Sequence, residues 1–346
     1  MTFDKNGNRA YIDKGLSYVN ENGIKVTRLD NKKPIRVNRL FKRYIGAYKA
    51  IENAAPDIIF IHGCQFMDID QVIKYVKKHK AVKVYVDNHA DYSNSATNVL
   101  SKNILHKLFW KSCAHKIEPY VKKFYGVLPA RVDFLVDLYK LPKEKCELLV
   151  MGVDDEKAEE AERPEVRSEI RGKYAIGEDD FLIITGGKID MFKQQTLLLM
   201  DAVNRINDPK VKLIVFGSVV NELKEEVNKR CSDRVKYIGW VQSDESYKYF
   251  AAGDLAVFPG RHSVFWEQVA GQGIPMIVKH WEGTTHVDLG GNVKFLYDDS
   301  EAEIEQALRE VVYDKDVYDS MKQVAEQKGK DVFSYLNIAR RSIEER

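Results

Sequence analysis

The stretch Phe258-Pro-Gly-Arg-His-Ser-Val-Phe-Trp-Glu-Gln-Val-Ala-Gly-Gln-Gly-Ile-Pro275 decides the fold. It reads as the end of a strand, a polar loop, a short helix and a Gly-x-Pro restart into the next strand. Ser263 is the expected N-cap, and Gly273 is expected to end the helix. Glu267 then lies in the first helical turn, with Gly271 on the same face, where a ligand could approach the backbone closely. Such a unit predicts a ligand-binding α/β sheet.

Short apolar runs alternate with segments of helical period on both sides of this stretch. Strands are expected at 57–62, 82–87, 146–154, 181–185, 212–216, 235–238, 254–258, 275–278 and 294–297. The helices between them show apolar faces such as Leu198, Ala202 and Ile206. This alternation is typical of mostly parallel sheets covered by helices.

The composition indicates a two-domain protein of ordinary globular class. The chain has 346 residues, 44% of them hydrophobic and 31% charged, with a formal net charge of +2. This is enough apolar material for two cores, and it gives no nucleic-acid signature. No apolar run has membrane-spanning length, and the N-terminus lacks the apolar core of a signal peptide. We therefore expect a cytoplasmic protein that binds no nucleic acid.

The acidic stretch 154–165 has no apolar period and suits a hinge. It predicts a boundary between a first domain at 1–154 and a second domain at 155–325. Residues 326–346 are expected to form a C-terminal helix that returns to the first domain. The four cysteines and eight histidines show no metal-ligand spacing, so no protein-bound metal is predicted.

The loop Gly186-Gly-Lys-Ile-Asp-Met-Phe-Lys193 combines permissive backbone, two cations and a following helix N-terminus. These features outline a phosphate site, although a Gly-Gly turn flanked by lysines is often only a solvated loop. Lys188 and Lys193 would stabilise a leaving diphosphate. Glu267 could accept hydrogen bonds from two adjacent ribose hydroxyls; the alternative is a carboxylate that only stabilises its helix dipole.

These residues resemble family 4 of the retaining glycosyltransferases of the GT-B fold (glycosyl transferases group 1), over about residues 45–340. The resemblance implies two Rossmann-like domains facing across a cleft, anomeric retention and no metal or other cofactor. The family's diphosphate-binding stretch maps onto Gly187, Lys188 and Lys193, and its ribose-binding glutamate maps onto Glu267. Gly217, after the strand at 212–216, is a further match on the nucleotide-sugar side.

The chain departs from the family pattern at three places. Gln194 replaces the usual glycine of the diphosphate-binding stretch. The family's signature is a pair of glutamates eight positions apart, and Pro259 stands in place of the first of them. The loop instead shows a His-Ser-Val-x-Trp-Glu-Gln form, in which His262 is expected where the missing carboxylate would meet the donor sugar. Family members open with a strand and a Gly-rich loop, whereas this chain opens with residues 2–8, Thr-Phe-Asp-Lys-Asn-Gly-Asn. We therefore expect a first domain that lacks the opening strand, either because the chain is truncated or because the subgroup has lost that unit.

A polar cluster follows the strand at 82–87. His89 resembles the family's histidine that meets the donor sugar, although a lone histidine at a strand end often has a structural role. Asp87 or Asp91 would orient His89 or contact the acceptor hydroxyl, and the sequence does not choose between them. On the donor side, the loop after the strand at 275–278 offers Glu282, Gly283 and Thr284 for diphosphate or sugar contacts.

The segment 102–124 mixes cations and aromatic residues at helical spacing. Such a face can dock on anionic lipid, which would give peripheral contact with the inner face of a membrane. The alternative is an amphipathic helix that packs on its own sheet.

The sequence thus predicts a glycosyltransferase that moves a hexosyl unit from a UDP- or GDP-linked sugar to a glycan or lipid-linked acceptor in surface polysaccharide synthesis. Two alternatives stay open. A sugar-nucleotide epimerase would need acid/base carboxylates at the sugar, and a non-catalytic nucleotide-binding scaffold would fit the missing glutamate.

Overall fold

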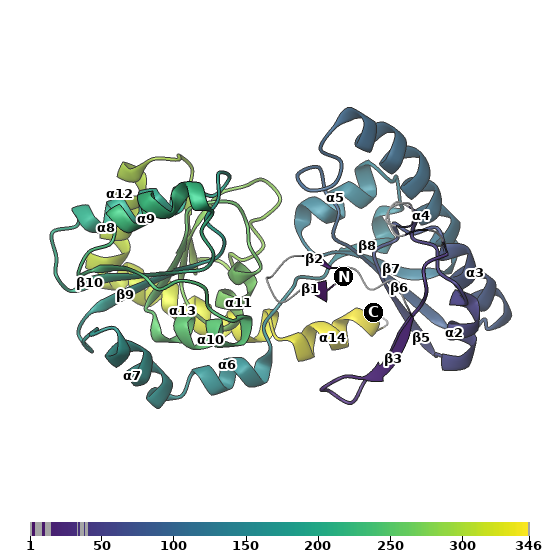
Figure 1. Cartoon of the computed structure of the whole chain (residues 1–346), viewed down its shortest axis with the longest axis horizontal. Helices are drawn as coiled ribbons and strands as arrows, with labels where there is room; N and C mark the ends of the chain where they lie inside the picture. The colour runs from purple at the N-terminus through teal and green to yellow at the C-terminus, as the bar shows by residue number, and fades with distance from the viewer. Residues whose placement is uncertain are drawn as a thin grey trace. The chain divides into compact units, whose positions relative to one another are not determined.

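The computed structural model describes residues 15–32, 34, 38 and 41–344, and the backbone alone at 2–3 and 9–10 (Figure 1). The chain divides into two compact units, Met1–Leu149 and Val150–Arg346. The division falls shortly before the hinge expected at 154, and residues 326–346 group with the second unit. Their predicted return to the first domain stays a prediction, and the opening stretch at 2–8 lies largely outside the described residues.

The first unit contains a four-stranded parallel sheet in the order β5-β6-β7-β8. Among the described residues, β5 is the first strand of this sheet along the chain. Two short antiparallel pairs, β1 with β2 and β3 with β4, precede it. The elements are β1 (Thr2–Phe3), β2 (Arg9–Ala10), β3 (Leu16–Val19), β4 (Lys25–Arg28), α2 (Ala47–Ala54), β5 (Ile58–His62), α3 (Ile69–Lys78), β6 (Lys83–Asn88), η1 (Ser101–Trp110), α4 (Lys111–Ile117), η2 (Glu118–Tyr120), β7 (Val121–Gly126), α5 (Pro129–Asp137), η3 (Lys143–Lys145) and β8 (Cys146–Leu148).

The second unit contains a six-stranded parallel sheet in the order β11-β10-β9-β12-β13-β14. The strand order reverses between β9 and β12, which is the point at which doubly wound sheets bind ligands. The elements are α6 (Asp155–Ala161), α7 (Pro164–Lys173), β9 (Phe181–Gly186), α8 (Gln195–Arg205), β10 (Val211–Phe216), η4 (Asn221–Leu223), α9 (Lys224–Lys229), β11 (Val235–Tyr237), α10 (Ser243–Ala252), β12 (Leu255–Phe258), α11 (Phe265–Gly271), β13 (Met276–Lys279), β14 (Val293–Leu296), α12 (Glu301–Tyr313), α13 (Lys315–Val332) and α14 (Tyr335–Ile343).

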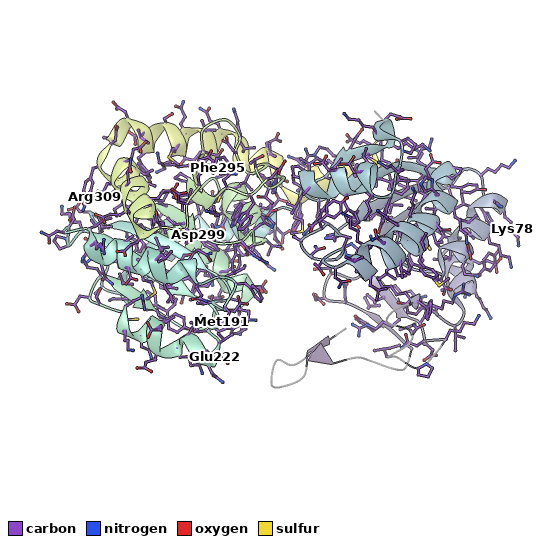
Figure 2. The ribbon with its side chains drawn as sticks, turned by 90° about the horizontal axis from the view of Figure 1, so that it is seen from above. Lys78, Met191, Glu222, Phe295, Asp299 and Arg309 are labelled. Atoms are coloured by element: carbon purple, nitrogen blue, oxygen red, sulfur yellow. The ribbon has the colours of Figure 1, made fainter. Side chains whose placement is uncertain are left out.

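The central strands of the second sheet are apolar and buried on both faces, as parallel strands covered by helices should be. β9 and β12 are almost entirely buried. Helices α8 and α12 pack together over one face, and Arg309 marks α12 in Figure 2. The predicted faces of these helices are confirmed, because Ala202, Ile206 and Leu308 lie in the same core cluster.

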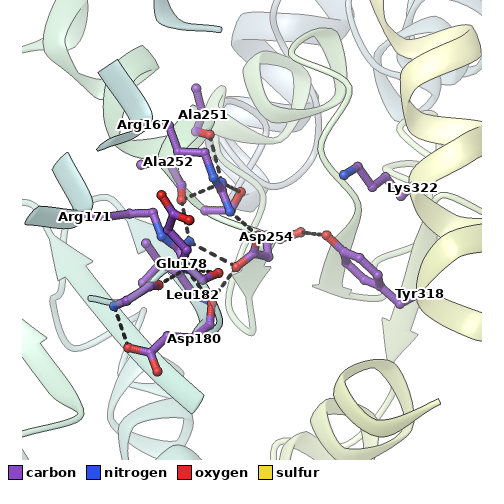
Figure 3. Close-up of polar contacts among 12 residues, drawn as sticks. Arg167, Arg171, Glu178, Asp180, Leu182, Ala251, Ala252, Asp254, Tyr318 and Lys322 are labelled. Atoms are coloured by element: carbon purple, nitrogen blue, oxygen red, sulfur yellow. Dashed lines mark hydrogen bonds and ion pairs between the residues drawn. The ribbon is translucent and has the colours of Figure 1, made fainter. Parts of the chain in front are cut away.

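A buried ion network fixes the amino ends of β9 and β12 (Figure 3). Asp254 accepts hydrogen bonds from Arg167 at 2.6 Å, from Arg171 at 3.3 Å and from the backbone N–H of Leu182 at 2.7 Å. Arg171 is 4% exposed and also donates to the carbonyl of Gly177. Charges at this edge of the sheet are therefore paired within the protein, and the opposite, carboxyl edge is left for ligands.

Three expectations about local structure are wrong. The acidic stretch 154–165 is not a hinge without structure, because it forms α6 and the start of α7, with Ala158 and Ala161 buried. Residues 121–126 form β7 instead of continuing a helical face. Gly271 does not open α11 to a ligand, since a Cβ there would lie 2.5 Å from the side chain of Val153.

Candidate nucleotide-sugar site

The second unit has a small pocket at the carboxyl ends of β9 and β12, where the strand order reverses. The loop between β9 and α8, which carries Met191 in Figure 2, forms one wall, and the loop after β12 forms the other. The lining residues are Thr185, Gly186, Gly187, Lys188, Ile189, Lys193, Thr196, Val215, Phe216, Phe258, Pro259, Gly260, Arg261 and Ser263. Four predicted site residues, Gly187, Lys188, Lys193 and Ser263, are thus brought together.

Glycine is required where two loops cross beneath this pocket. Gly187 and Gly217 have φ values of 132° and 125°, which other residues rarely adopt. A Cβ on Gly217 would lie 1.8 Å from the carbonyl oxygen of Gly187. Gly217 does not line the pocket, and its role is to let the 217–219 loop pack against the Gly187 turn. The turn in consequence presents open backbone to the pocket, with nothing within 4 Å of a Cβ on Gly187.

Three cations converge on the pocket with little to neutralise them. Lys188 is exposed and pairs with Asp190 at 3.2 Å. Burial lowers the pKa of Lys193, and the charges of Arg261 and Lys188 lower it further. The carboxylate of Asp190 acts in the opposite direction but does not outweigh them. Among the described residues, no carboxylate forms an ion pair with Lys193 or Arg261. A bound anion would supply the missing negative charge.

Arg261 is a site residue that the sequence reasoning missed. It lies three positions after the end of β12, and its guanidinium stacks 5.3 Å from the ring centroid of Phe192. Its signal was present, because a cation follows the strand within the polar loop. The histidine next to it drew the interpretation instead. An arginine in this position offers a planar fork suited to phosphate oxygens.

Glu267 is placed differently from the prediction. Its side chain is 0% exposed, and its Oε1 accepts hydrogen bonds from His262 Nε2 and His286 Nε2, each at 2.9 Å. Burial alone would raise the pKa of Glu267, but these two histidines outweigh burial and hold the pKa at about 2. The two histidines make Glu267 a clamp through Oε1, whereas its buried Oε2 has no hydrogen-bond partner among the residues that the structure describes, and the predicted ribose contact stays a prediction.

His262 therefore faces Glu267 and is not free in the pocket. Its side chain is 14% exposed, and its ring contacts the edge of Trp266 at 5.1 Å. The clamp ties the loop that carries Arg261 to the loop that carries His286. His286 was not predicted, because it is distant from His262 along the chain and matches no motif.

Of the remaining donor-side predictions, Ser263 lines the pocket, whereas Glu282, Gly283 and Thr284 do not. Val264, not Ser263, is the N-cap of α11, and Ser263 Oγ accepts only a long hydrogen bond from Phe265 N–H at 3.4 Å. Thr284 Oγ1 donates to the carbonyl of Trp281, so its hydroxyl closes its own turn. Gly283 holds that turn with φ 74°, and Glu282 is exposed beside it.

In the first unit, Asp87 lies at the carboxyl end of β6 and orients two histidines. Its Oδ2 accepts from His62 Nδ1 at 2.8 Å and from His89 Nε2 at 3.2 Å, and its Oδ1 accepts from the N–H of Gly63. The sequence left open whether Asp87 or Asp91 would orient His89, and the structure selects Asp87. His62, at the end of β5, was not predicted; its side chain is 75% exposed.

Asp91 has a structural role in its own turn. Its Oδ1 caps the turn through the N–H groups of Ser93 and Asn94, and its Oδ2 accepts from Arg131 at 3.1 Å. Burial would raise the pKa of Asp91, but the bonds from Ser93 and Arg131 lower it overall. An acceptor contact of Asp87 or Asp91 stays a prediction.

Two groups have three possible metal-ligand atoms within 4.8 Å of one another: His62, Asp87 and His89, and His262, Glu267 and His286. Sequence spacing does not reveal either group, because each is assembled from separate loops. In both, hydrogen bonds between the histidines and the carboxylate account for the arrangement, and we describe them as hydrogen-bonded clusters.

No protein-family model matches the sequence, and the search of curated proteins gives no match. Solved structures do match. Sucrose-phosphate synthase from Thermosynechococcus elongatus has a TM-score of 0.65 at 13% identity, covering 94% of this chain and 83% of that one. Anabaena HepE in complex with UDP has a TM-score of 0.61 at 16% identity, covering 85% and 79%. A putative UDP-N-acetylglucosamine 2-epimerase from Listeria monocytogenes has a TM-score of 0.60 at 12% identity, covering 88% and 78%.

These likenesses extend over most of the chain, and they agree with the two parallel α/β units and with the strand order of the second sheet. The chain therefore has the GT-B fold.

Proposed function

We propose that this protein transfers a sugar from a nucleotide-diphosphate sugar to a hydroxyl acceptor. The observation that carries the proposal is the set of cations on the Gly187 turn, at the point where the second sheet reverses its strand order. The diphosphate group of such a donor has the charge that these cations would bind. Because HepE, of the same fold, was solved with UDP, a uridine nucleotide is the donor we expect.

In this proposal the cations act on the leaving group. As the bond from the sugar to the diphosphate breaks, negative charge grows on the phosphate oxygens. Lys193 and Arg261 lie where they would stabilise that charge, and the Gly187 turn, which has no side chain, would let a phosphate approach closely. Fixed protein cations can do this without a divalent metal. Retention of anomeric configuration and a role in polysaccharide synthesis follow the resemblance to family 4 and are part of the proposal.

Epimerisation is the less favoured enzyme function, although an epimerase shares the fold. An epimerase must exchange a proton or cleave the donor with acid/base groups beside the sugar. The residues that line the pocket include no carboxylate. A scaffold that only binds nucleotide would keep the cations and lose turnover, so turnover separates it from the transferase.

A nucleotide panel tests the proposal. Thermal unfolding is measured with UDP, GDP, ADP, UMP and their sugar conjugates, with and without EDTA, because a ligand of the folded state raises the midpoint. We expect one diphosphate nucleotide to give the largest shift, its monophosphate a smaller one, and EDTA to change neither. We also expect the protein to release that nucleotide slowly from its sugar conjugate, which mass spectrometry of the reaction mixture would detect.

Lys210→Ala is the matched control, since this exposed lysine precedes β10 at the opposite edge of the same sheet. It should behave as the wild type does. If none of the nucleotides shifts the unfolding midpoint, the donor site is refuted. Binding with no release of nucleotide, in the presence of glycan and lipid-linked acceptors, would favour the scaffold.

A further inference from the structure

One helical run of the first unit, residues 99–117, has a buried face and a bare face. On the buried face, Trp110, Cys113 and Ile117 join the core, and His106 Nδ1 lies 2.9 Å from the Tyr139 hydroxyl. The segment therefore does pack on its own sheet, as one of the two sequence interpretations expected. Its other face remains to be explained.

The bare face is an apolar stripe, which we define as Val99, Leu100, Ile104, Leu108 and Phe109. These side chains are 76%, 67%, 45%, 61% and 46% exposed. The run adopts π-helical winding at η1, so that residues four and five apart share a face. In an α-helix, neighbours on a face are three and four apart, and Val99 and Phe109 would leave the stripe. The winding thus gathers apolar side chains toward solvent.

Positive charge accompanies the stripe. Between Tyr92 and Ile117 the chain has four lysines, at 102, 107, 111 and 116, and no aspartate or glutamate. Lys116 pairs with Asp70 at 3.5 Å, whereas in the described part of the chain no carboxylate pairs with Lys107 or Lys111. A partner that matches this surface must be both apolar and anionic.

An open hollow of about 580 Å³ adjoins the stripe. Val99 lines it beside Lys102 and Lys107, and the Lys102 ammonium lies 4.9 Å from the ring centroid of Tyr92. Two ammonium groups around a hollow at the end of an apolar stripe offer room for a phosphate headgroup whose acyl chains meet the apolar side chains.

We propose that this surface docks the protein on a bilayer containing anionic phospholipid. The apolar stripe enters the boundary between headgroups and acyl chains, and the lysines contact lipid phosphates. Nucleic acid matches the lysines but gives no reason for five exposed apolar side chains. A neutral apolar partner would match the stripe but would not explain why the segment between Tyr92 and Ile117 has four lysines and no acidic residue. This contact goes beyond sugar transfer and does not depend on it.

The test is co-sedimentation of the full chain with vesicles of phosphatidylcholine alone and with an equal mixture of phosphatidylcholine and phosphatidylglycerol. We expect binding to the mixed vesicles only, weakened by salt at about 1 M because screening is then nearly complete. Leu108→Glu should weaken binding at least about tenfold through lost apolar burial. Lys102→Glu with Lys107→Glu should weaken it by at least about fivefold for each lysine.

Ile24→Glu and Lys315→Glu are matched controls, because both side chains are as exposed as the tested ones and lie elsewhere. Both should bind as the wild type does, and the unfolding midpoint of every variant is measured to check that it is folded. Failure to bind mixed vesicles, or equal binding by Leu108→Glu, overturns the proposal. So does a dimer in light scattering that Leu108→Glu dissociates, since the stripe would then belong to a second copy.

Discussion

Replacing Lys193 and Arg261 together with alanine is expected to weaken nucleoside diphosphate binding by about a hundredfold or more. Each side chain offers a charge-assisted hydrogen bond to phosphate, and such bonds contribute about 1.5–3 kcal/mol each. Neither cation forms an ion pair with a carboxylate among the described residues, so binding breaks no internal pair. Isothermal titration with UDP, or with whichever nucleotide gives the largest thermal shift, measures the loss for the double variant and for each single variant.

The same titration has a defined pH dependence. Burial and the neighbouring cations lower the pKa of Lys193, so its positive charge is lost at a lower pH than that of an ordinary lysine. Affinity should therefore fall as the pH rises through that lowered pKa, because neutral lysine no longer attracts phosphate. Lys193→Arg should remove this fall, since arginine keeps its charge. Lys210→Ala is the control, and unchanged affinity in the double variant would refute the pocket assignment.

Replacing Glu267 with glutamine is expected to destabilise the folded protein by about 3 kcal/mol near neutral pH, since one pKa unit corresponds to about 1.36 kcal/mol. The carboxylate accepts from His262 and His286 in a fully buried position, and the amide is a weaker acceptor with no charge. Urea unfolding of wild type and variant gives the difference. His286→Asn, which keeps the carboxylate and removes one donor, should lose less.

The sign of the pH effect follows from the depressed pKa. The folded-state pKa of Glu267 is about 2, below its ordinary value of 4.5, so its stabilisation is present above that ordinary value. This stabilisation is lost as the pH falls from about 4.5 toward about 2. The difference in free energy of unfolding between the wild type and Glu267→Gln should therefore become smaller over that pH range. Glu282 is an exposed carboxylate in the same unit, and Glu282→Gln should have the same free energy of unfolding as the wild type over this pH range. A folded variant of full stability that fails to bind nucleotide would instead restore the ribose role.

Most of the fold could be predicted because its strands are short apolar runs bounded by glycine and polar residues. β9 and β12 were located within a residue or two for this reason. β7 was missed because Lys122 and Lys123 interrupt its apolar pattern, and the preceding helix made the segment look helical. α6 was missed because Ala158 and Ala161 bury its face with too little hydrophobicity to show a period.

The candidate site was predictable only where local sequence determines local geometry. Gly187 and Lys193 follow directly from a glycine turn after a strand. Clusters that form between loops could not be found, because His286 reaches Glu267, and His62 reaches Asp87, only after the sheet places them together. Pairing of that kind depends on which strand ends are neighbours, and spacing along the chain does not contain it.

A crystal structure of the protein with the nucleoside diphosphate that stabilises it most tests the central claim most directly. We predict that the diphosphate lies in the pocket between β9 and β12, beside the Gly187 turn, with its oxygens on Lys193 and Arg261. Glu267 should remain on its two histidines. A nucleotide bound elsewhere, or a diphosphate that contacts neither Lys193 nor Arg261, would contradict the account.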